Sequence, residues 1–240
     1  MKTKKSRLFA GILVLAMALA LLLSGASPAR AITMADLLGG LDVVIGDKSF
    51  ENFRNYVSVG TNGAYAVNPS EISVSFSITP AGLYQVDYQS GIMTVGQNQL
   101  QDTRFTYDVR VITGQPLLNG NGVTLLSYGL GGSNAAADLG KLSVSATVTD
   151  AGGGALAYEM VQDDHGGIVS SASAWWASPV NKLIVASDIA LSGDNVSGGG
   201  AFISDFTQTF SQTAVPEPAT MLLLGFGLLG LTGIRRKIQK

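Results

Sequence analysis

Apolar and polar residues alternate along several segments in the middle of the chain. Ile72, Val74, Phe76 and Ile78 are separated by single serines, and the same period of two recurs over 105–111 and 142–148. A period of two places one row of side chains in a core and the other in water, which is typical of β-strands and excludes a mainly helical domain. The aromatic run Phe202, Phe206 and Phe210 is expected to add a further strand with its rings inward.

Turn signals separate these segments. Further apolar runs predict strands at 56–59, 83–88, 123–128, 168–173 and 182–191. Clusters of Gly, Asn and Asp predict turns at 61–63, 89–91, 119–122, 150–154 and 193–200. About ten short strands with so little helical pattern favour an all-β fold, an antiparallel, jelly-roll-like β-sandwich over 32–212. One short helix is expected at 32–38, with Thr33 as N-cap and Gly39 and Gly40 ending it.

The N-terminus has the three parts of a Sec signal peptide. Lys2, Lys4, Lys5 and Arg7 precede the apolar run 8–23, and Ala29 and Ala31 form an A-x-A cleavage site. We expect a signal peptide over 1–31, inserted by the Sec translocon and cut by signal peptidase after Ala31. Cleavage after Ala26 and an uncleaved anchor are the alternatives.

The C-terminus, 213–240, also has three parts. Pro216, Glu217 and Pro218 hold the backbone extended, since proline fixes φ and lacks an N–H. The run 219–234 is uncharged and, as a helix, would measure about 24 Å, slightly short of a bilayer core. The basic residues that follow would stay in the cytoplasm and stop transfer; they are Arg235, Arg236 and Lys237. A transmembrane helix is therefore expected, with an ordinary anchor or a buried core helix as alternatives.

Val215–Lys240 resembles a PEP-CTERM sorting signal, found on exported proteins of Gram-negative bacteria. The resemblance implies recognition of Pro216, Glu217 and Pro218 by an exosortase, which cuts near the motif, and a host that makes extracellular polysaccharide. The segment 46–53 resembles a "DKxFxNF" opening of uncharacterised exported proteins with such tails, a group that implies no activity.

Composition narrows the partners. Residues 32–215 carry six basic and sixteen acidic residues, a net charge of −10, so a nucleic-acid partner is not expected. The chain has no cysteine, which excludes disulfides, thiol catalysis and zinc–thiolate sites.

The middle of the chain shows no catalytic motif. The single histidine, His165, lies in a Gly-flanked polar stretch that reads as a hairpin tip, a poor place for a preorganised base. We therefore expect no enzyme activity, although a hydrolase that uses His165 stays an alternative.

Two residue pairs are candidates for binding. Asp163 and Asp164 offer oxygen ligands to Ca²⁺, although Asp is also an ordinary turn residue and no EF-hand spacing is present. No other cofactor is expected. Trp175 and Trp176 are neighbours, so in a strand one would point to the core and at most one outward, and the pair would not make a flat sugar platform.

These features predict an exported structural protein of the cell surface or extracellular matrix. It would be anchored in the inner membrane by its C-terminal helix, then processed and associated with exopolysaccharide in a biofilm. The alternative is a carbohydrate- or calcium-binding module of the same fold.

Overall fold

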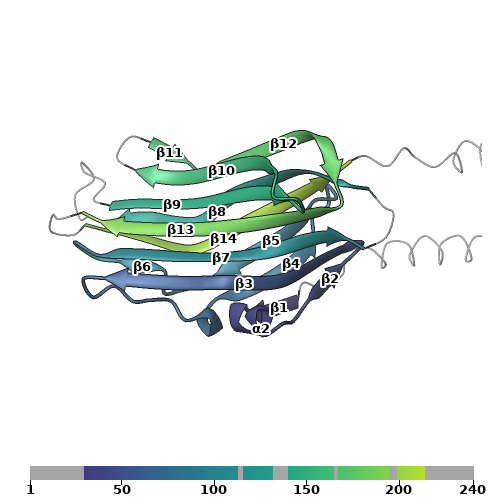
Figure 1. Ribbon diagram of the computed structural model, residues 1–240. Helices are drawn as coiled ribbons and strands as arrows, with labels where there is room; N and C mark the ends of the chain where they lie inside the picture. Colours follow the sequence, from purple (N-terminus) through teal and green to yellow (C-terminus); the bar gives the residue numbers. More distant parts are fainter. Residues whose placement is uncertain (1–29, 113–115, 132–139, 165–166, 195–198, 214–240) are drawn as a thin grey trace, which may run out of the picture.

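Two antiparallel β-sheets pack face to face in the computed structural model, which describes residues 30–112, 116–131, 140–164, 167–194 and 199–213 (Figure 1). Sheet A has the order β1-β4-β5-β14-β8-β12, and β6 pairs with β14 beyond the end of β5. Its strands are β1 (Arg30–Thr33), β4 (Ser73–Ile78), β5 (Tyr84–Gln89), β6 (Thr94–Val95), β8 (Leu118–Gly131), β12 (Ser171–Val180) and β14 (Gly200–Gln212).

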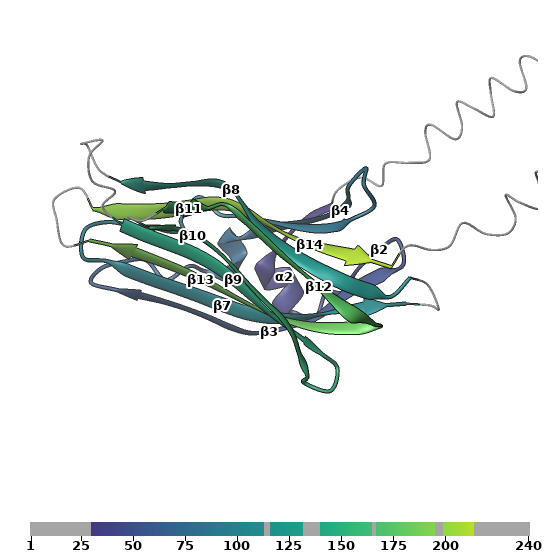
Figure 2. The same cartoon turned by 90° about the horizontal axis from the view of Figure 1, so that it is seen from above.

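Sheet B lies in front of sheet A in the view of Figure 1 and has the order β11-β10-β9-β13-β7-β3-β2. Its strands are β2 (Val43–Ile45), β3 (Lys48–Thr61), β7 (Leu100–Val111), β9 (Gly140–Asp150), β10 (Ala155–Asp164), β11 (Gly167–Val169) and β13 (Lys182–Gly193). The predicted all-β antiparallel sandwich is thus confirmed. Figure 2, seen from above, shows the long strands of the two sheets on either side of the helix α2 (Met34–Leu38).

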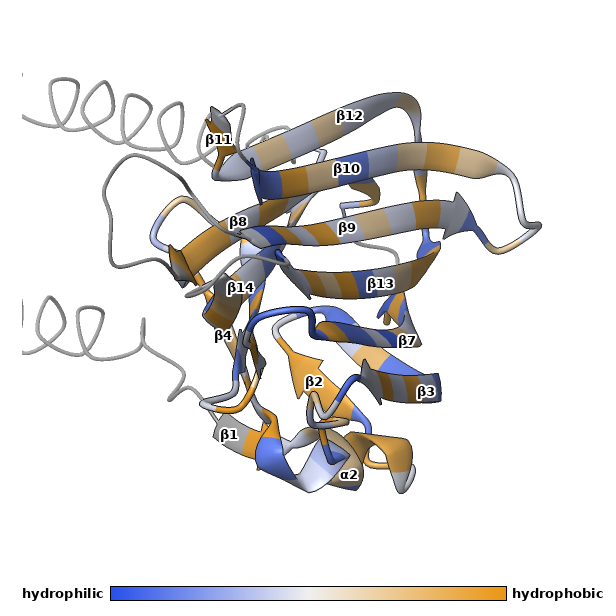
Figure 3. Ribbon diagram, turned by 90° about the vertical axis from the view of Figure 1, so that its left-hand side faces the viewer, coloured by the Kyte–Doolittle hydropathy of each residue, from blue (hydrophilic) through white to orange (hydrophobic). Residues whose placement is uncertain are grey.

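The alternation of apolar and polar residues has the expected result. In β9 the buried residues are Leu142, Val144, Ala146 and Val148, while the serines and threonines between them face outward. Figure 3 shows this alternation as bands of colour along β9. Because both sheets turn their apolar side chains inward, one continuous core fills the space between them.

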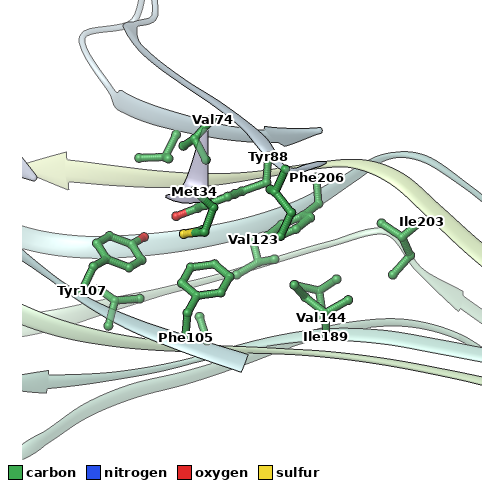
Figure 4. Close-up of a cluster of buried hydrophobic side chains, with 14 of the residues drawn as sticks. Met34, Val74, Tyr88, Phe105, Tyr107, Val123, Val144, Ile189, Ile203 and Phe206 are labelled. Atoms are coloured by element: carbon green, nitrogen blue, oxygen red, sulfur yellow. The ribbon is translucent and has the colours of Figure 1, made fainter. Parts of the chain in front are cut away.

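Aromatic rings dominate the centre of that core (Figure 4). Tyr88 from sheet A stacks on Phe206 with 4.7 Å between ring centroids, and faces Phe105 from sheet B at 5.3 Å. Tyr107 lies beside Phe105 at 6.2 Å. Offset and tilted ring pairs of this kind fit the quadrupole of the aromatic ring.

Several sequence predictions were wrong, among them one turn and the inward position of Phe202. Asn119–Gly122, expected as a turn, lies inside β8, where glycines make room for side chains of the neighbouring strands. Phe202, expected in the core, is 42% exposed. The register of β14 shifts twice near Ser204, and such bulges reverse the face to which the residues before them point.

The short helix was predicted closely. Thr33 caps α2: its Oγ1 accepts from the Asp36 N–H at 3.2 Å, and Asp36 Oδ2 accepts from the Thr33 N–H at 2.9 Å. This reciprocal capping box satisfies two donors that a helix start leaves free. Gly39 ends the helix as expected.

The predicted terminal segments fall largely outside the described residues. That is so for most of the signal peptide, including Ala29, and for the sorting tail with Pro216, Glu217, Pro218, Arg235, Arg236 and Lys237. Strand β1 begins at Arg30, just before the predicted cleavage point after Ala31, and β14 ends at Gln212. Among the described residues, no helix has the length and apolar character that crossing a bilayer requires.

Candidate functional site

The outer face of sheet B carries two shallow grooves that follow one another along β7, β9, β10 and β13. The larger has a volume of about 350 Å³ and is lined by residues that include Arg104, Ser145, Thr147, Tyr158 and Asp188. The smaller, of about 170 Å³, is lined by Lys141, Ser143, Met160, Gln162 and Asp164 among others. We call these ten residues the sheet B groove.

Strand register sets the groove residues in rows across the sheet. One row is Tyr158, Thr147, Ala186 and Thr106, in which each residue is paired with the next. The next row, two residues along, is Met160, Ser145, Asp188 and Arg104. A third is Gln162, Ser143, Ala190 and Asp102. Because residues two apart share a face, Tyr158 to Asp164 spans about 20 Å of one surface.

An exposed aromatic ring stands at one end of the groove. The Tyr158 side chain is 62% exposed, and its hydroxyl donates weakly to Met160 Sδ at 3.5 Å. A large ring left in water over a row of hydroxyls offers an apolar contact with polar groups beside it. Binding sites for small polar ligands commonly combine these two features.

The centre of the groove holds a group of charges. Arg104 Nη2 lies 2.7 Å from Asp102 Oδ2, and Asp188 is the cross-strand partner of Arg104. Burial, followed by the nearby charge of Asp102, raises the pKa of Asp188. Guanidinium and carboxyl groups presented side by side can donate to and accept from neighbouring hydroxyls of a ligand.

Beyond the Tyr158 end of the groove, the same face of sheet B carries paired charges. Asp108 is buried and accepts from Arg54 Nη1 at 2.8 Å and from Lys182 Nζ at 2.9 Å. The Asn52 amide also donates to it, at 3.0 Å. Burial alone would raise the pKa of Asp108, but these three hydrogen bonds lower it below its ordinary value. Its oxygens are thus engaged within the protein.

The two aspartates proposed to bind calcium lie on opposite faces of their strand. Asp163 and Asp164 are adjacent in β10, so their side chains leave opposite faces of the strand. Asp163 is buried, whereas Asp164 lines the sheet B groove. Within the described residues, no three acidic or histidine side chains gather as a metal site would need. His165 lies outside those residues, between the paired Asp164 and Gly167.

Sequence reasoning missed the groove because it missed β10. The residues of 155–164 alternate, but both sets contain apolar members, and Glu159 occupies an inward position. The sequence did contain a signal for the groove, because every second residue of 158–164 has a side chain that can line an outer face. These residues are Tyr158, Met160, Gln162 and Asp164. The neighbouring strands β7, β9 and β13 were predicted from the sequence, but their order in the sheet was not.

The two adjacent tryptophans point to opposite sides of β12, as predicted. Trp176 packs against the core and donates its Nε1–H to the Leu118 carbonyl at 3.0 Å. Trp175 points away from the core and is 67% exposed.

Comparisons with known proteins identify the tail. Residues 214–237 match the PEP-CTERM protein-sorting motif, which confirms the sorting signal expected from the sequence. The motif implies exosortase processing and an exported, cell-surface-sorted protein. A search of curated proteins finds no match to the chain.

Solved structures resemble the sandwich remotely. TmCBM61 in complex with beta-1,4-galactotriose shares 12% identity over 66% of this chain and 88% of its own, at a TM-score of 0.29. TmCBM27, a carbohydrate-binding module with specific mannan recognition, shares 9% sequence identity. The match covers 78% of this chain and 100% of that chain, with a TM-score of 0.26. A DUF4465 family protein from Bacteroides caccae shares 10% sequence identity. The match covers 67% of this chain and 100% of that chain, with a TM-score of 0.24. At these scores the likeness carries no argument about a ligand.

Proposed function

We propose that this PEP-CTERM-bearing protein is a non-enzymatic structural component of the cell surface or extracellular matrix, associated with extracellular polysaccharide. Its signal peptide delivers it through the Sec translocon, and its C-terminal helix holds it in the inner membrane of a Gram-negative cell. An exosortase then recognises Pro216, Glu217 and Pro218 and processes the tail. The match of 214–237 to the sorting motif is the observation that carries this proposal.

The acidic middle of the chain supports a matrix role over a nucleic-acid role. A net charge of −10 over 32–215 repels phosphate backbones, while an uncharged polysaccharide imposes no such penalty. No catalytic constellation was found in the sequence, and His165 is the only histidine available as a base.

Intact-mass measurement of the exported protein tests the route. In the natural host, the mature chain should lack Arg235, Arg236 and Lys237, and a strain without the exosortase should retain them. Glu217→Ala should block processing, whereas Thr213→Ser, just before the motif, should leave it unchanged. A C-terminus that keeps Arg235 in both strains would overturn the processing step.

A second candidate is a carbohydrate-binding module, and the sheet B groove favours it. Tyr158, a row of hydroxyls and the Arg104–Asp188 pair offer apolar and polar contacts along about 20 Å of surface. Calorimetry with the host's polysaccharide should then show binding. Calcium should give no heat of its own, because the described acidic side chains do not gather into a metal site. Absence of heat with both would remove this candidate and its calcium-binding variant.

A further inference from the structure

The folded domain ends only three residues before the Pro-Glu-Pro motif. The Thr213 N–H donates to the Leu117 carbonyl at 2.9 Å, and Gln212, the last residue of β14, pairs with Leu118. The motif begins at Pro216. Because three residues of extended chain span at most about 11 Å, the motif lies no farther than that from the bonded end of the domain.

Hydrogen bonds gather several strand ends around the point where β14 ends (Figure 1). Lys48, whose ammonium contacts the last residue of β14, also donates to the Pro116 carbonyl at 3.2 Å. The neighbouring Asp47 carbonyl accepts from the Ile112 N–H at 2.9 Å. Since Leu117 follows Pro116, Leu117 and Ile112 both lie at the end of the sandwich from which the tail departs.

A shallow hollow of about 390 Å³ lies beside Leu117 at this end. Its walls include Leu117, Pro179 and Val180, together with Asp150 and Lys182. Both charged side chains are engaged within the protein: Asp150 Oδ1 accepts from two N–H groups of its own turn at 2.8 Å, and Lys182 Nζ lies 2.9 Å from the buried carboxylate of β7. The groups that remain for a partner are therefore mainly apolar.

The apolar side chains at this end are partly open to water. Leu117 is 38% exposed and Ile112 is 42% exposed. We call Ile112, Leu117, Pro179 and Val180 the tail-end surface. Single exposed apolar residues are ordinary, but three of these four line one hollow at the place where the chain leaves the fold. A partner with apolar side chains would cover them.

The enzyme that reads the motif is the partner that must come close to this surface. An exosortase that holds 216–218 needs a wall on each side of the peptide, and even a single helix is about 10–12 Å thick. The space between Thr213 and the motif is no larger than that. On the other side of the motif the uncharged run begins at once, at Ala219. The enzyme therefore has no room to hold the motif without touching the tail-end surface.

We propose that the exosortase docks on the tail-end surface while it holds the motif, with apolar side chains of the enzyme packed into the hollow beside Leu117. Recognition then extends from the three motif residues onto the folded sandwich. This inference rests on the exosortase processing proposed above. The docking contact and the motif are joined by a short segment, so each raises the effective concentration of the enzyme at the other.

Pulse-chase measurement of tail removal in the natural host tests the contact. Leu117→Asp places a charge in the hollow and should slow processing at least fivefold. Leu126→Asp is the matched control and should not change the rate. Leu126 is 53% exposed in β8 and lies nine residues further along the chain, or about 30 Å along the strand.

A second set of chains separates a lost contact from a folding defect. Six added Gly and Ser residues between Thr213 and Ala214 move the motif up to about 20 Å further from the domain. The enzyme then no longer has to touch the tail-end surface, so Leu117→Asp should change the processing rate of these chains less than twofold.

Photocrosslinking identifies the occupant of the surface. A chain with benzoylphenylalanine in place of Leu117 should crosslink to an epitope-tagged exosortase in the host, whereas the same replacement at Leu126 should not. Crosslinks only to lipid, or only to a second copy of the chain, would show a different occupant and would overturn the inference.

The processing rates separate the inference from the function on which it rests. Unchanged processing of Leu117→Asp would overturn the docking contact and leave exosortase processing standing. Equal slowing of the chains with and without the added residues would indicate a defect in folding or export, and would also overturn the contact. A wild-type chain that keeps Arg235 in the presence of the exosortase would overturn both the processing and the docking.

Discussion

Lys48 Nζ donates a hydrogen bond of 2.9 Å to Gln212 Oε1 and thereby ties the first residue of β3 to the last residue of β14. The two residues are 164 positions apart. Lys48 is fully buried, and its ammonium also contacts Asp47 Oδ2 at 2.6 Å and the Pro116 carbonyl at 3.2 Å. This contact gives the Asp47-Lys48 pair of the "DKxFxNF" segment a structural role: it fixes the end of the folded domain, just before the sorting tail.

Lys48→Met should therefore destabilise the fold. The change removes a buried cation from three acceptors and leaves Asp47 without its ion-pair partner, at a cost of about 3 kcal/mol in unfolding free energy. Urea denaturation measures the effect. Lys141→Met, at an exposed position, is the control and should change stability little. A Lys48→Met chain as stable as the control would contradict the proposed role of the contact.

Glu159 should make stability fall as the pH rises. Burial raises the pKa of this carboxyl, although the Asn121 amide, which donates at 3.0 Å, acts in the opposite direction. Since the folded pKa lies above the unfolded one, the protonated group favours folding at low pH. That contribution is lost as the pH rises from the ordinary glutamate range through the raised value.

Glu159→Gln should remove this dependence, because an amide does not ionise, and should be at least as stable as wild type at neutral pH. Urea midpoints measured at several pH values between 4 and about 8 report the difference. Identical pH profiles for the two proteins would show that Glu159 does not titrate as its burial implies.

Gln208 joins the two sheets through a buried polar contact. Its Nε2 donates to Ser187 Oγ at 2.7 Å, and its Oε1 accepts from the hydroxyls of Tyr107 and Tyr88. Gln208→Leu would leave both tyrosine hydroxyls and the serine without this partner, which should lower the unfolding free energy by about 3 kcal/mol. Gln89→Leu, at an exposed position, is the control. A loss no larger than that of the control would mean that the hydroxyls find other partners.

Gly120→Ala should displace the Trp175 ring. The new methyl group would overlap Ser211 Oγ and press on the indole, so a loss of about 1–3 kcal/mol in unfolding free energy is expected. Gly91→Ala, where a Cβ meets no atom within 4 Å, is the matched control. Tryptophan fluorescence should shift only in Gly120→Ala, and an unchanged spectrum would contradict the close contact.

Strand pattern was predictable where one face alone is apolar. In 72–78 and 142–148, serines and threonines alternate with apolar residues, so the period of two was clear. It failed at 155–164, because exposed Tyr158 and Met160 lie on the face opposite a buried glutamate. Tertiary contacts there override the local pattern.

The errors at Asn119–Gly122 and Phe202 share a cause. Glycine and asparagine usually mark turns, yet in β8 the glycines serve close approach by Trp175 and Thr209 from neighbouring strands. A bulge near Ser204 likewise depends on how β14 pairs with β8. A short segment of sequence does not determine which strands pair or where a bulge forms, because both depend on the partner strand. The sorting motif, by contrast, is contiguous and was predicted in full.

The association with polysaccharide is tested most directly by the affinity of the host's extracellular polysaccharide for the exported protein and its Tyr158→Ala variant, measured by calorimetry. Tyr65→Ala, a change at an exposed aromatic residue outside the sheet B groove, is the control. The groove predicts at least tenfold weaker binding for Tyr158→Ala and no change for Tyr65→Ala. Equal affinity of all three proteins would contradict the assignment of the groove as the polysaccharide contact.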